Sequence, residues 1–320
     1  MREIPTILSS QEILDKAFRR VKKVIITDLT GSKRARAEAM GRLSALSNTI
    51  TALLGKYVRA FPSLDQSHPF ERELIDITIG LDELRHSIGA IDWARKTVET
   101  VHKTELSKMK SAPAKSEISK ALNSAYGRIS SVVNRVSGEL EFLNSARDKL
   151  RDMADINPEE IVVVVAGCPN VGKSQIVARI SSGKPVIASY PFTTKGVSIG
   201  HMHIGYDRVQ IMDTPGLLDR ELKARNKIEL QAIAALEHIA DVVLYIFDPS
   251  ETCGYSIQAQ THLRDEILAK FPEIPAIMIC NKSDMAASEL GLNVSAATGA
   301  GMDILLSQLE DAVKKALSER

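Results

Sequence analysis

One glycine-rich loop, residues 167–174, constrains this chain more than any other stretch of its sequence. It reads G-x-x-x-x-G-K-S, follows the apolar run 161–166 and precedes a segment, 175–180, that can form a helix. A strand, a glycine-rich loop and a helix in this order are the context in which such a motif holds phosphates. The backbone N–H groups of the loop and the positive end of the helix dipole both favour an anion. The loop therefore predicts a strand–loop–helix unit that binds a phosphate-bearing ligand.

The side chains at the end of this loop have separate expected roles. Lys173 is expected to reach the β and γ phosphates and to take part in catalysis. The Ser174 hydroxyl is placed for Mg²⁺, which keeps mostly water and phosphate oxygens around it. The residues of this loop expected to bind nucleotide are Asn170, Val171, Gly172, Lys173, Ser174 and Gln175.

Strands alternate with helices along the second half of the chain. A mostly parallel, six-stranded sheet covered by helices on both faces is the expected result. Residues 183–196 are expected to form a loop. The expected strands are 161–166, 197–204, 208–213, 242–247, 276–280 and 292–294, the second and third as a hairpin, and the expected helices are 175–180, 228–238, 256–270 and 302–317.

Further motifs follow the expected strands, where ligands of such sheets bind. Asp213 and Gly216 form D-x-x-G, which supplies a carboxylate to the magnesium shell and a flexible N–H to a γ-phosphate. Thr193 or Thr194 can supply a hydroxyl to Mg²⁺ when a triphosphate is present, and Thr194 is the candidate for the metal and catalytic sites. The expected metal ligands are thus Ser174, Thr194 and Asp213, and Gly216 is expected to act in catalysis.

An N-K-x-D motif predicts which base is bound. Because a carboxylate accepts two hydrogen bonds at once, Asp284 can pair with the adjacent N1–H and N2–H₂ donors of guanine, whereas adenine has an acceptor at N1. Asn281 can tie loops together, and the stem of Lys282 can cover the base. Ser295 and Ala296 can present a backbone N–H to guanine O6.

The sequence offers no obvious residue to orient the attacking water. Some GTPases place a glutamine directly after D-x-x-G, and Leu217 occupies that position here. We therefore expect slow GTP hydrolysis without an activator. Asn170 is a candidate ligand for a monovalent cation such as K⁺, which would substitute for an arginine finger. His201 and His203 lie on an expected strand and are interpreted as structural.

The first half reads as an antiparallel bundle of helices, residues 1–158, in front of the strand–helix domain, residues 159–320. Its expected helices begin at Ser9 or Ser10, with Glu12 in the first turn, and continue over 34–60, 70–110, 116–136 and 137–154, the third broken near Gly89. Trp93 is expected in the core. Residues 24–26 carry only a weak strand signal.

Net charge is +1, but residues 1–155 carry 26 Lys and Arg against 20 Asp and Glu, and residues 156–320 carry 15 against 20. Much of the positive excess lies within 16–42, and we call its nine cations the basic cluster. They are Lys16, Arg19, Arg20, Lys22, Lys23, Lys33, Arg34, Arg36 and Arg42.

Two interpretations of the basic cluster stand side by side: a solvated helix face, or a site for a polyanion. Aromatic residues are not interleaved with it, which favours the backbone of folded RNA over stacked bases, and no DNA partner is expected. The three cysteines have no disulfide or zinc spacing, no apolar run is long enough for a membrane span, and 1–5 do not read as a signal peptide. A cytoplasmic protein without a membrane partner is the expectation.

These motifs resemble the Obg-related branch of translation-associated GTPases, and more narrowly the Nog-type nucleolar GTP-binding proteins. The resemblance covers most of the chain, more specifically after residue 160. In the second half it rests on the phosphate loop 167–174 and on F-T-T-K from Phe192, G-H-M from Gly200, R-N-x-I-E-x-Q-A-I from Arg225 and D-x-S-E-x-C-G from Asp248. In the first half it rests on A-R from Ala94, Y-G-R from Tyr126 and L-E-x-L from Leu140.

The resemblance implies that residues 159–320 form a Ras-like P-loop G domain after the helical domain. It also implies a GTP-hydrolysing switch that binds Mg²⁺ with GTP or GDP and acts in assembly of the large ribosomal subunit, with the helical domain on ribosomal RNA. Eukaryotic members are nucleolar and carry a long C-terminal extension, so this chain looks like the short archaeal type. Gln175 departs from the small hydroxyl residue usual after G-K-S. The alternative is a nucleotide-regulated adaptor that binds a protein partner, with hydrolysis incidental.

Overall fold

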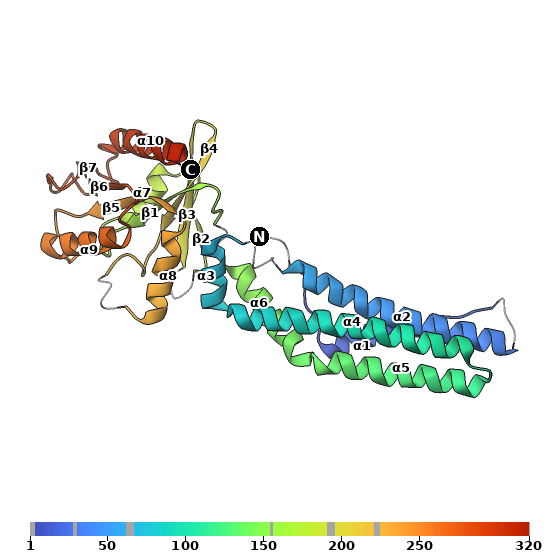
Figure 1. Cartoon of the computed structure of the whole chain (residues 1–320). Coiled ribbons are helices and arrows are strands. Elements are labelled where there is room, and N and C mark those ends of the chain that lie inside the picture. Colours follow the sequence, from blue (N-terminus) through green and yellow to red (C-terminus); the bar gives the residue numbers. More distant parts are fainter. Residues whose placement is uncertain are drawn as a thin grey trace. The chain divides into compact units, whose positions relative to one another are not determined.

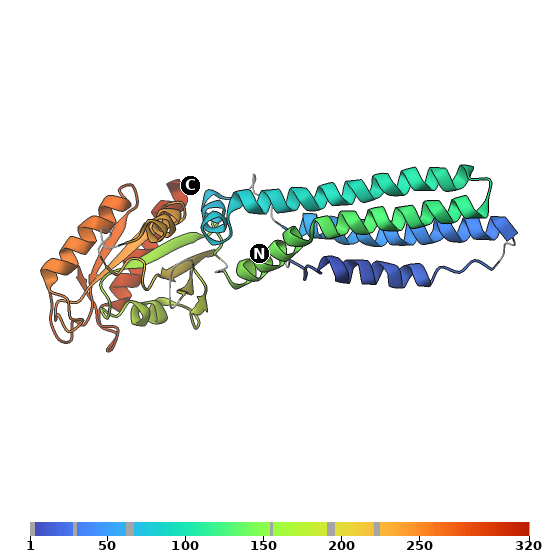
Figure 2. The ribbon, with the colours of Figure 1, turned by 90° about the horizontal axis from the view of Figure 1, so that it is seen from below.

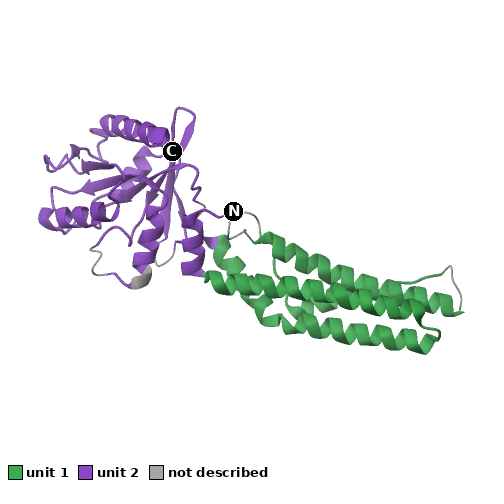
Figure 3. Cartoon of the chain, in the orientation of Figure 1, with its two compact units in different colours: residues 1–66, 79–151 green, residues 67–78, 152–320 purple. Residues whose placement is uncertain are grey.

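The computed structural model describes residues 4–27, 31–61, 67–153, 156–190, 196–220 and 225–319. The chain folds into two compact units, one of residues 1–66 with 79–151 and one of 67–78 with 152–320 (Figure 3). The predicted linear division at 158 differs from this one in residues 67–78 and 152–158, which belong with the second unit.

The first unit is helical. Its helices are α1 (Ser10–Lys22), α2 (Gly31–Ala60), α4 (Leu81–Ser111), α5 (Lys115–Arg135) and α6 (Ser137–Asp152). Figures 1 and 2 show α1, α2, α4 and α5 side by side, in alternating directions along the bundle. The predicted antiparallel bundle is confirmed. Aliphatic side chains at helical spacing fill its core, among them the fully buried Leu43, Leu46, Ile50, Leu54, Leu84 and Ile91.

The start of α1 follows the capping rule predicted from sequence. The Ser9 hydroxyl accepts the N–H of Glu12 at 3.3 Å, and the Glu12 carboxylate accepts the N–H of Ser9 at 2.8 Å. Two donors that the first turn leaves open are thereby satisfied. Ile13, Ala17 and Val21 recur on one face of this helix and are buried.

Two expectations for the first half are wrong. The helical segment is interrupted at Gly80, which takes φ 93°, and not at Gly89. Gly89 lies within α4, and a Cβ added there would meet no atom within 4 Å. Trp93 is 43% exposed, and the Arg135 guanidinium lies 5.3 Å over its ring. The Trp93 ring therefore lies outside the core, where its face is in contact with a cation. Residues 24–26 form no strand.

A seven-stranded sheet organises the second unit, in the order β2-β3-β4-β1-β5-β6-β7. β1 lies in the centre and pairs in parallel with β4 and β5, while β3 and β4 form the predicted antiparallel hairpin. The strands are β1 (Ile161–Ala166), β2 (Val186–Ala188), β3 (Val197–Ile204), β4 (Asp207–Asp213), β5 (Ala240–Phe247), β6 (Ala276–Cys280) and β7 (Leu292–Asn293).

The mostly parallel P-loop fold is confirmed, but the strand count of six is wrong. The extra strand is β2, an edge strand within 183–196, where only a loop was expected. Val186 and Ile187 are adjacent apolar residues and both are exposed. The alternation of apolar and polar residues that predicts a half-buried strand is therefore missing there.

Helices cover both faces of the sheet, as expected. Figures 1 and 2 show α7 (Lys173–Ile180) and α10 (Met302–Glu319) on one face and α8 (Lys227–Glu237) and α9 (Ile257–Lys270) on the other. α3 (Pro69–Thr78) packs on α8. All of β1 is buried, so the loop that follows it is anchored in the centre of the core.

Candidate functional site

The loop 167–174 connects β1 to α7, in the strand–loop–helix order that the motif requires. Gly167 takes φ 139° and Gly172 takes φ 100°, conformations that side chains rarely adopt. A Cβ at Gly167 would meet the Ile246 carbonyl oxygen at 2.5 Å, and one at Gly172 would collide with the Asn281 amide. Both glycines are therefore required by crowding as well as by backbone angle.

Lys173 is buried at the start of α7. Its ammonium donates to the carbonyl oxygens of Gly167 at 2.8 Å and Cys168 at 2.9 Å. Burial lowers the pKa of Lys173, and the carboxylates of Asp219 and Asp213 oppose that shift. The cation is thus held inside the loop next to two acids, where a phosphate chain would find it.

Ser174 and Asp213 meet across two elements. The Ser174 hydroxyl donates to Asp213 Oδ2 at 2.5 Å, while Oδ1 of Asp213 is buried and has no hydrogen-bond partner among the described residues. Burial raises the pKa of Asp213, against the hydrogen bond from Ser174 and the charge of Lys173. A hydroxyl beside an unsatisfied carboxylate oxygen fits the hydrated shell of a magnesium ion.

The segment after β4 holds its own network of charges. The Gly216 N–H donates to Asp219 Oδ2 at 2.8 Å, and Asp219 Oδ1 accepts Arg225 Nη2 at 3.2 Å. The Arg225 guanidinium also donates to the Gly216 carbonyl and lies 4.0 Å from Glu229, and its side chain is completely buried. Leu217 is completely buried too, consistent with an apolar residue in place of a glutamine.

The start of α8 carries a reciprocal cap. The Asn226 N–H donates to the Glu229 carboxylate at 2.9 Å, and the Glu229 N–H donates to the Asn226 side chain at 2.8 Å. Arg220 donates to the other oxygen of Glu229 at 2.7 Å. The sequence interpretation used R-N-x-I-E only for the resemblance and missed both Asp219 and Arg225 as contacts of Gly216.

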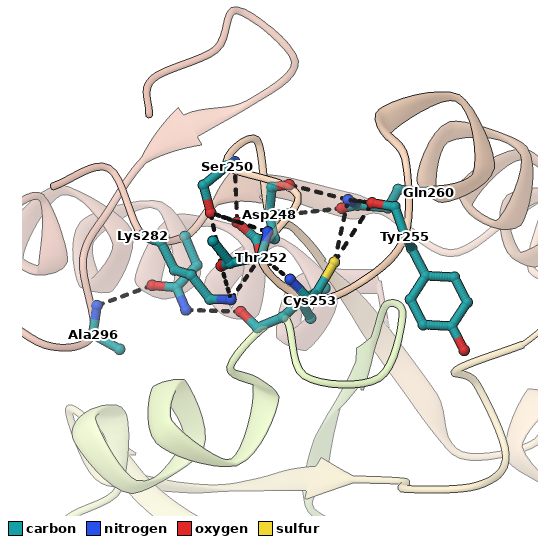
Figure 4. Close-up of polar contacts among 10 residues, drawn as sticks. Asp248, Ser250, Thr252, Cys253, Tyr255, Gln260, Lys282 and Ala296 are labelled. Atoms are coloured by element: carbon teal, nitrogen blue, oxygen red, sulfur yellow. Dashed lines mark hydrogen bonds and ion pairs between the residues drawn. The ribbon is translucent and has the colours of Figure 1, made fainter. Parts of the chain in front are cut away.

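The N-K-x-D motif lies at the end of β6. Asn281 donates to the Val171 carbonyl at 2.9 Å and accepts the Ala296 N–H at 3.0 Å. It thus ties the phosphate loop to the loop after β7, as expected. Lys282 takes φ 61°, and its ammonium donates to Asp248 and Thr252 (Figure 4).

Asp284 is exposed at the same edge of the sheet. The Ser295 hydroxyl donates to Asp284 Oδ1 at 2.5 Å, which orients the carboxylate. The N–H of Ser295 donates to the Ala300 carbonyl at 2.9 Å, and that of Ala296 donates to Asn281. Both N–H groups expected to reach a base are therefore engaged within the protein.

The other predicted residues are placed as follows. Asn170 is exposed and takes φ 63°, Val171 is buried, and Gln175 is exposed on the first turn of α7. Thr193 and Thr194 lie outside the described residues. His203 is exposed on β3. His201 is partly buried there, and burial lowers its pKa.

The cysteines are buried free thiols, in keeping with the absence of disulfide spacing. Burial raises the pKa of Cys168 to about 11 and also raises that of Cys253 and Cys280. Among the residues with described coordinates, no group of three or more His, Cys, Asp or Glu could hold a metal ion, and no helix is long and apolar enough to cross a membrane.

Two family models match the chain. The model of the NOG1 N-terminal helical domain matches residues 1–157, and the model of nucleolar GTP-binding protein 1 (NOG1) matches residues 227–284. An uncharacterized protein of Methanocaldococcus jannaschii is 34% identical over 292 residues, which cover 90% of this chain and 82% of that protein.

Eukaryotic relatives are similar over a part of their length. The nucleolar GTP-binding protein 1 of Saccharomyces cerevisiae is 30% identical over 90% of this chain, which spans 45% of the yeast protein. A solved structure assigned to the nucleolar GTP-binding protein 1 of Plasmodium falciparum matches with a TM-score of 0.47 and 31% identity, over 52% of this chain and 93% of that one.

A helical unit and a P-loop unit with this strand order define a protein with a Ras-like, GTPase-type domain behind a helical N-terminal region. Within that class, the chain belongs to the nucleolar GTP-binding protein 1 family, and it covers the length of its short archaeal relative much more fully than that of the yeast protein. The resemblance stated from the sequence is confirmed.

Proposed function

We propose that this protein binds guanine nucleotides with Mg²⁺ and hydrolyses GTP to GDP and phosphate, as a switch in assembly of the large ribosomal subunit. The observation that carries the proposal is the bridge made by Asn281. Its side chain joins Val171 of the phosphate loop to Ala296, so the phosphate site and the exposed Asp284 lie at one edge of the sheet. A nucleotide bound at this edge would have its phosphates at the phosphate loop and its base at Asp284.

Asp284 would make the site selective for guanine. Its carboxylate accepts from Ser295 through Oδ1 and remains exposed, so it can also accept the N1–H and N2–H₂ donors of guanine. The N–H groups of Ser295 and Ala296 are both engaged, so a contact with guanine O6 requires one of them to exchange its present acceptor. The remaining base contact is the stem of Lys282.

The phosphate end would hold the metal and the reacting group. Ser174 and Asp213 would bind Mg²⁺ directly or through water, with Thr194 as the third proposed ligand, and Lys173 would contact the β and γ phosphates. The metal neutralises the charge that develops on the phosphates. Gly216 would donate its N–H to the γ-phosphate, and Asn170 would hold a K⁺ ion beside the loop. With Leu217 in place of a glutamine, hydrolysis is slow unless an activator is present.

The proposed switch depends on the exchange of one hydrogen bond, the bond donated by the Gly216 N–H. In the structure the Gly216 N–H donates to Asp219, which Arg225 also holds. A γ-phosphate competes with Asp219 for that N–H, and hydrolysis returns it. Binding of GTP would therefore change the contacts among Gly216, Asp219 and Arg225, and an effector could recognise that change.

The basic cluster is the proposed contact with ribosomal RNA in the cytoplasm. Lys16, Arg19 and Arg20 on α1, together with Lys22 and Lys23 at its end, are exposed, and so is Lys33. Three others have partners within the same unit: Arg34 and Arg42 pair with Glu38 at the surface, and Arg36 donates to the Ala112 carbonyl at 2.6 Å. The exposed members would neutralise RNA phosphates, and binding would weaken with salt.

Co-sedimentation with ribosomal subunits at several salt concentrations tests this proposal, with GDP, with a non-hydrolysable GTP analogue, and with Lys173→Ala as the nucleotide-free control. We expect salt-sensitive binding to the large subunit or its precursors with the analogue. Reversing the charge of Arg19, Arg20, Lys22 and Lys23 to Glu should weaken RNA binding and flatten its salt dependence.

A matched variant reverses four other exposed cations of the same unit and should keep the salt slope: Lys103, Lys110, Lys115 and Lys120. If RNA binding is unaffected by salt and by both variants while a protein is captured with the analogue, the adaptor replaces the ribosome-assembly switch as the function.

A further inference from the structure

Asp248 comes directly after β5, and its carboxylate is completely buried. Five donors surround it. Oδ1 accepts the N–H of Ser250 at 3.1 Å and its hydroxyl at 2.5 Å. Oδ2 accepts the Cys253 N–H at 2.9 Å, the Thr252 hydroxyl at 3.1 Å and the Lys282 ammonium at 2.6 Å. Figure 4 shows these contacts converging on one side chain.

The charge state of Asp248 follows from this set. Burial by itself would raise its pKa, but the hydrogen bonds from Lys282, Ser250 and Cys253 together lower the pKa below the ordinary value. Asp248 is therefore an anion at neutral pH. The ammonium of Lys282 is one of several donors that hydrogen-bond to this carboxylate.

Gln260 fixes the same loop from α9. It is completely buried, its Oε1 accepts the Asp248 N–H at 2.7 Å, and its Nε2 donates to the carbonyl oxygens of Asp248 at 3.0 Å and Tyr255 at 2.9 Å. Both backbone groups of Asp248 are thus held by one side chain. The position of the carboxylate is set by the core and does not depend on Lys282.

Lys282 is held at both ends of its side chain. Its backbone takes φ 61° between Asn281, bonded to two other loops, and Ser283, whose N–H donates to the Val294 carbonyl at 3.0 Å. Its ammonium has two acceptors, Asp248 Oδ2 and the Thr252 hydroxyl at 2.8 Å. The methylene stem is therefore stretched between the N-K-x-D loop and the loop that follows β5.

We infer that Asp248, assisted by Thr252, is a positioning residue for base recognition, and that it holds the Lys282 stem as a fixed apolar surface against the guanine ring. The inference rests on the proposed nucleotide site. An unheld lysine stem samples many rotamers, and ordering it on binding would reduce affinity. The anchor removes that loss because the stem is already in place.

The geometry argues against a purely stabilising ion pair. Without Lys282, Asp248 would keep the two donors of Ser250, the Cys253 N–H and the Thr252 hydroxyl. The carboxylate does not need the ammonium to be satisfied in the core, whereas the ammonium has Asp248 and Thr252 as its described acceptors. The pair serves the position of the lysine more than the stability of the loop.

The stem and Asp284 read different features of a nucleotide. A methylene surface contacts the face of any purine, while the Asp284 carboxylate contacts the edge, including the 2-amino group. Hypoxanthine lacks that group. Loosening the stem should therefore weaken GDP and IDP by the same factor, and changing Asp284 should alter their ratio.

Calorimetric titration of the full chain with Mg²⁺ and either GDP or IDP tests this inference in four proteins: wild type, Asp248→Asn, Lys282→Met and the double variant. Asp248→Asn turns an amide toward the ammonium, and we expect about tenfold weaker binding of both nucleotides, with dissociation faster. Lys282→Met keeps an unbranched stem but removes the charge. In that background Asp248→Asn should have no further effect, because the two substitutions remove one interaction.

Thr252→Val is a second route to the same result if Asp248→Asn folds poorly. It keeps the shape, removes one acceptor of the ammonium and should weaken both nucleotides about threefold. Thr261→Val is the matched control: its hydroxyl donates to the Ile257 carbonyl within α9, and nucleotide affinity should stay unchanged.

The outcomes separate the two proposals. If Asp248→Asn lowers affinity equally in the wild-type and Lys282→Met backgrounds, Asp248 acts through the fold and the positioning role is wrong. If wild type binds GDP and neither Asp248→Asn nor Thr252→Val changes its affinity, only the positioning role fails. If wild type binds neither nucleotide, the proposed function itself fails, and the inference with it.

Discussion

The two ends of the candidate site are built differently. At the base end, the Asn281 side chain bonds to backbone groups of two other loops. Lys282 is held by the side chains of Asp248 and Thr252, and Asp284 accepts from the Ser295 hydroxyl. At the phosphate end, the Gly216 N–H is held by the side chain of Asp219. The comparison indicates that the side chains of the base end can keep these contacts when a nucleotide binds, while the Gly216 N–H must leave Asp219 to bind a γ-phosphate.

The largest effect should come from the base end. Asp284→Asn should weaken GDP binding by about three orders of magnitude, because an amide presents a donor to the donors of guanine. The same variant should gain xanthine nucleotides, whose C2 carbonyl accepts that donor. Titration with GDP and XDP measures both changes. Asp311→Asn, on the exposed face of α10, is the control.

Continued preference for GDP in Asp284→Asn would remove Asp284 from base recognition. It would also end the description of the base end as a guanine site.

A smaller effect is expected at the phosphate end. Asp219→Asn replaces a charged acceptor of the Gly216 N–H by a neutral one, so a γ-phosphate displaces it more easily. We expect the affinity for a non-hydrolysable GTP analogue, relative to GDP, to rise about fivefold. Competition binding with the two nucleotides measures this ratio.

An unchanged ratio in Asp219→Asn would mean that the Gly216 N–H does not have to leave Asp219 when the γ-phosphate binds. The two ends of the site would then both keep their contacts when a nucleotide binds, and the comparison would no longer hold.

The smallest effect concerns stability without nucleotide. Burial raises the pKa of Asp213, so its ionised form destabilises the folded chain at neutral pH. Asp213→Asn should raise the unfolding temperature by about 2–4 °C at pH 7, and it should abolish the Mg²⁺ dependence of GDP binding. Thermal unfolding with and without Mg²⁺ and GDP measures both.

The pH dependence of this gain has a definite sign. A group with a raised folded pKa favours folding at low pH and loses that contribution as pH rises through the folded value. The advantage of Asp213→Asn should therefore shrink toward acid, where the wild-type carboxyl is protonated. A gain that is constant with pH would show that the Asp213 charge is not its cause.

Much of this fold could be predicted because its signals are local. Continuous apolar runs located β1 and β6 at their observed bounds, and the Ser9–Glu12 pair located the start of α1. The exposed edge strand β2 lacked such a signal. Trp93 was misplaced because helical spacing does not distinguish a core position from one beneath Arg135.

For the candidate site, the motifs were enough to identify the residue types: a loop with Gly167, Gly172 and Lys173 for phosphates, and N-K-x-D for a base. The partners of these residues became visible only in the folded chain. Asp248 and Lys282 are far apart in sequence and meet because β5 and β6 are neighbours in the sheet. Asp219 takes the Gly216 N–H because a turn brings its carboxylate back onto the chain. Such contacts depend on strand order and on the path of loops, and no periodic pattern along the chain encodes them.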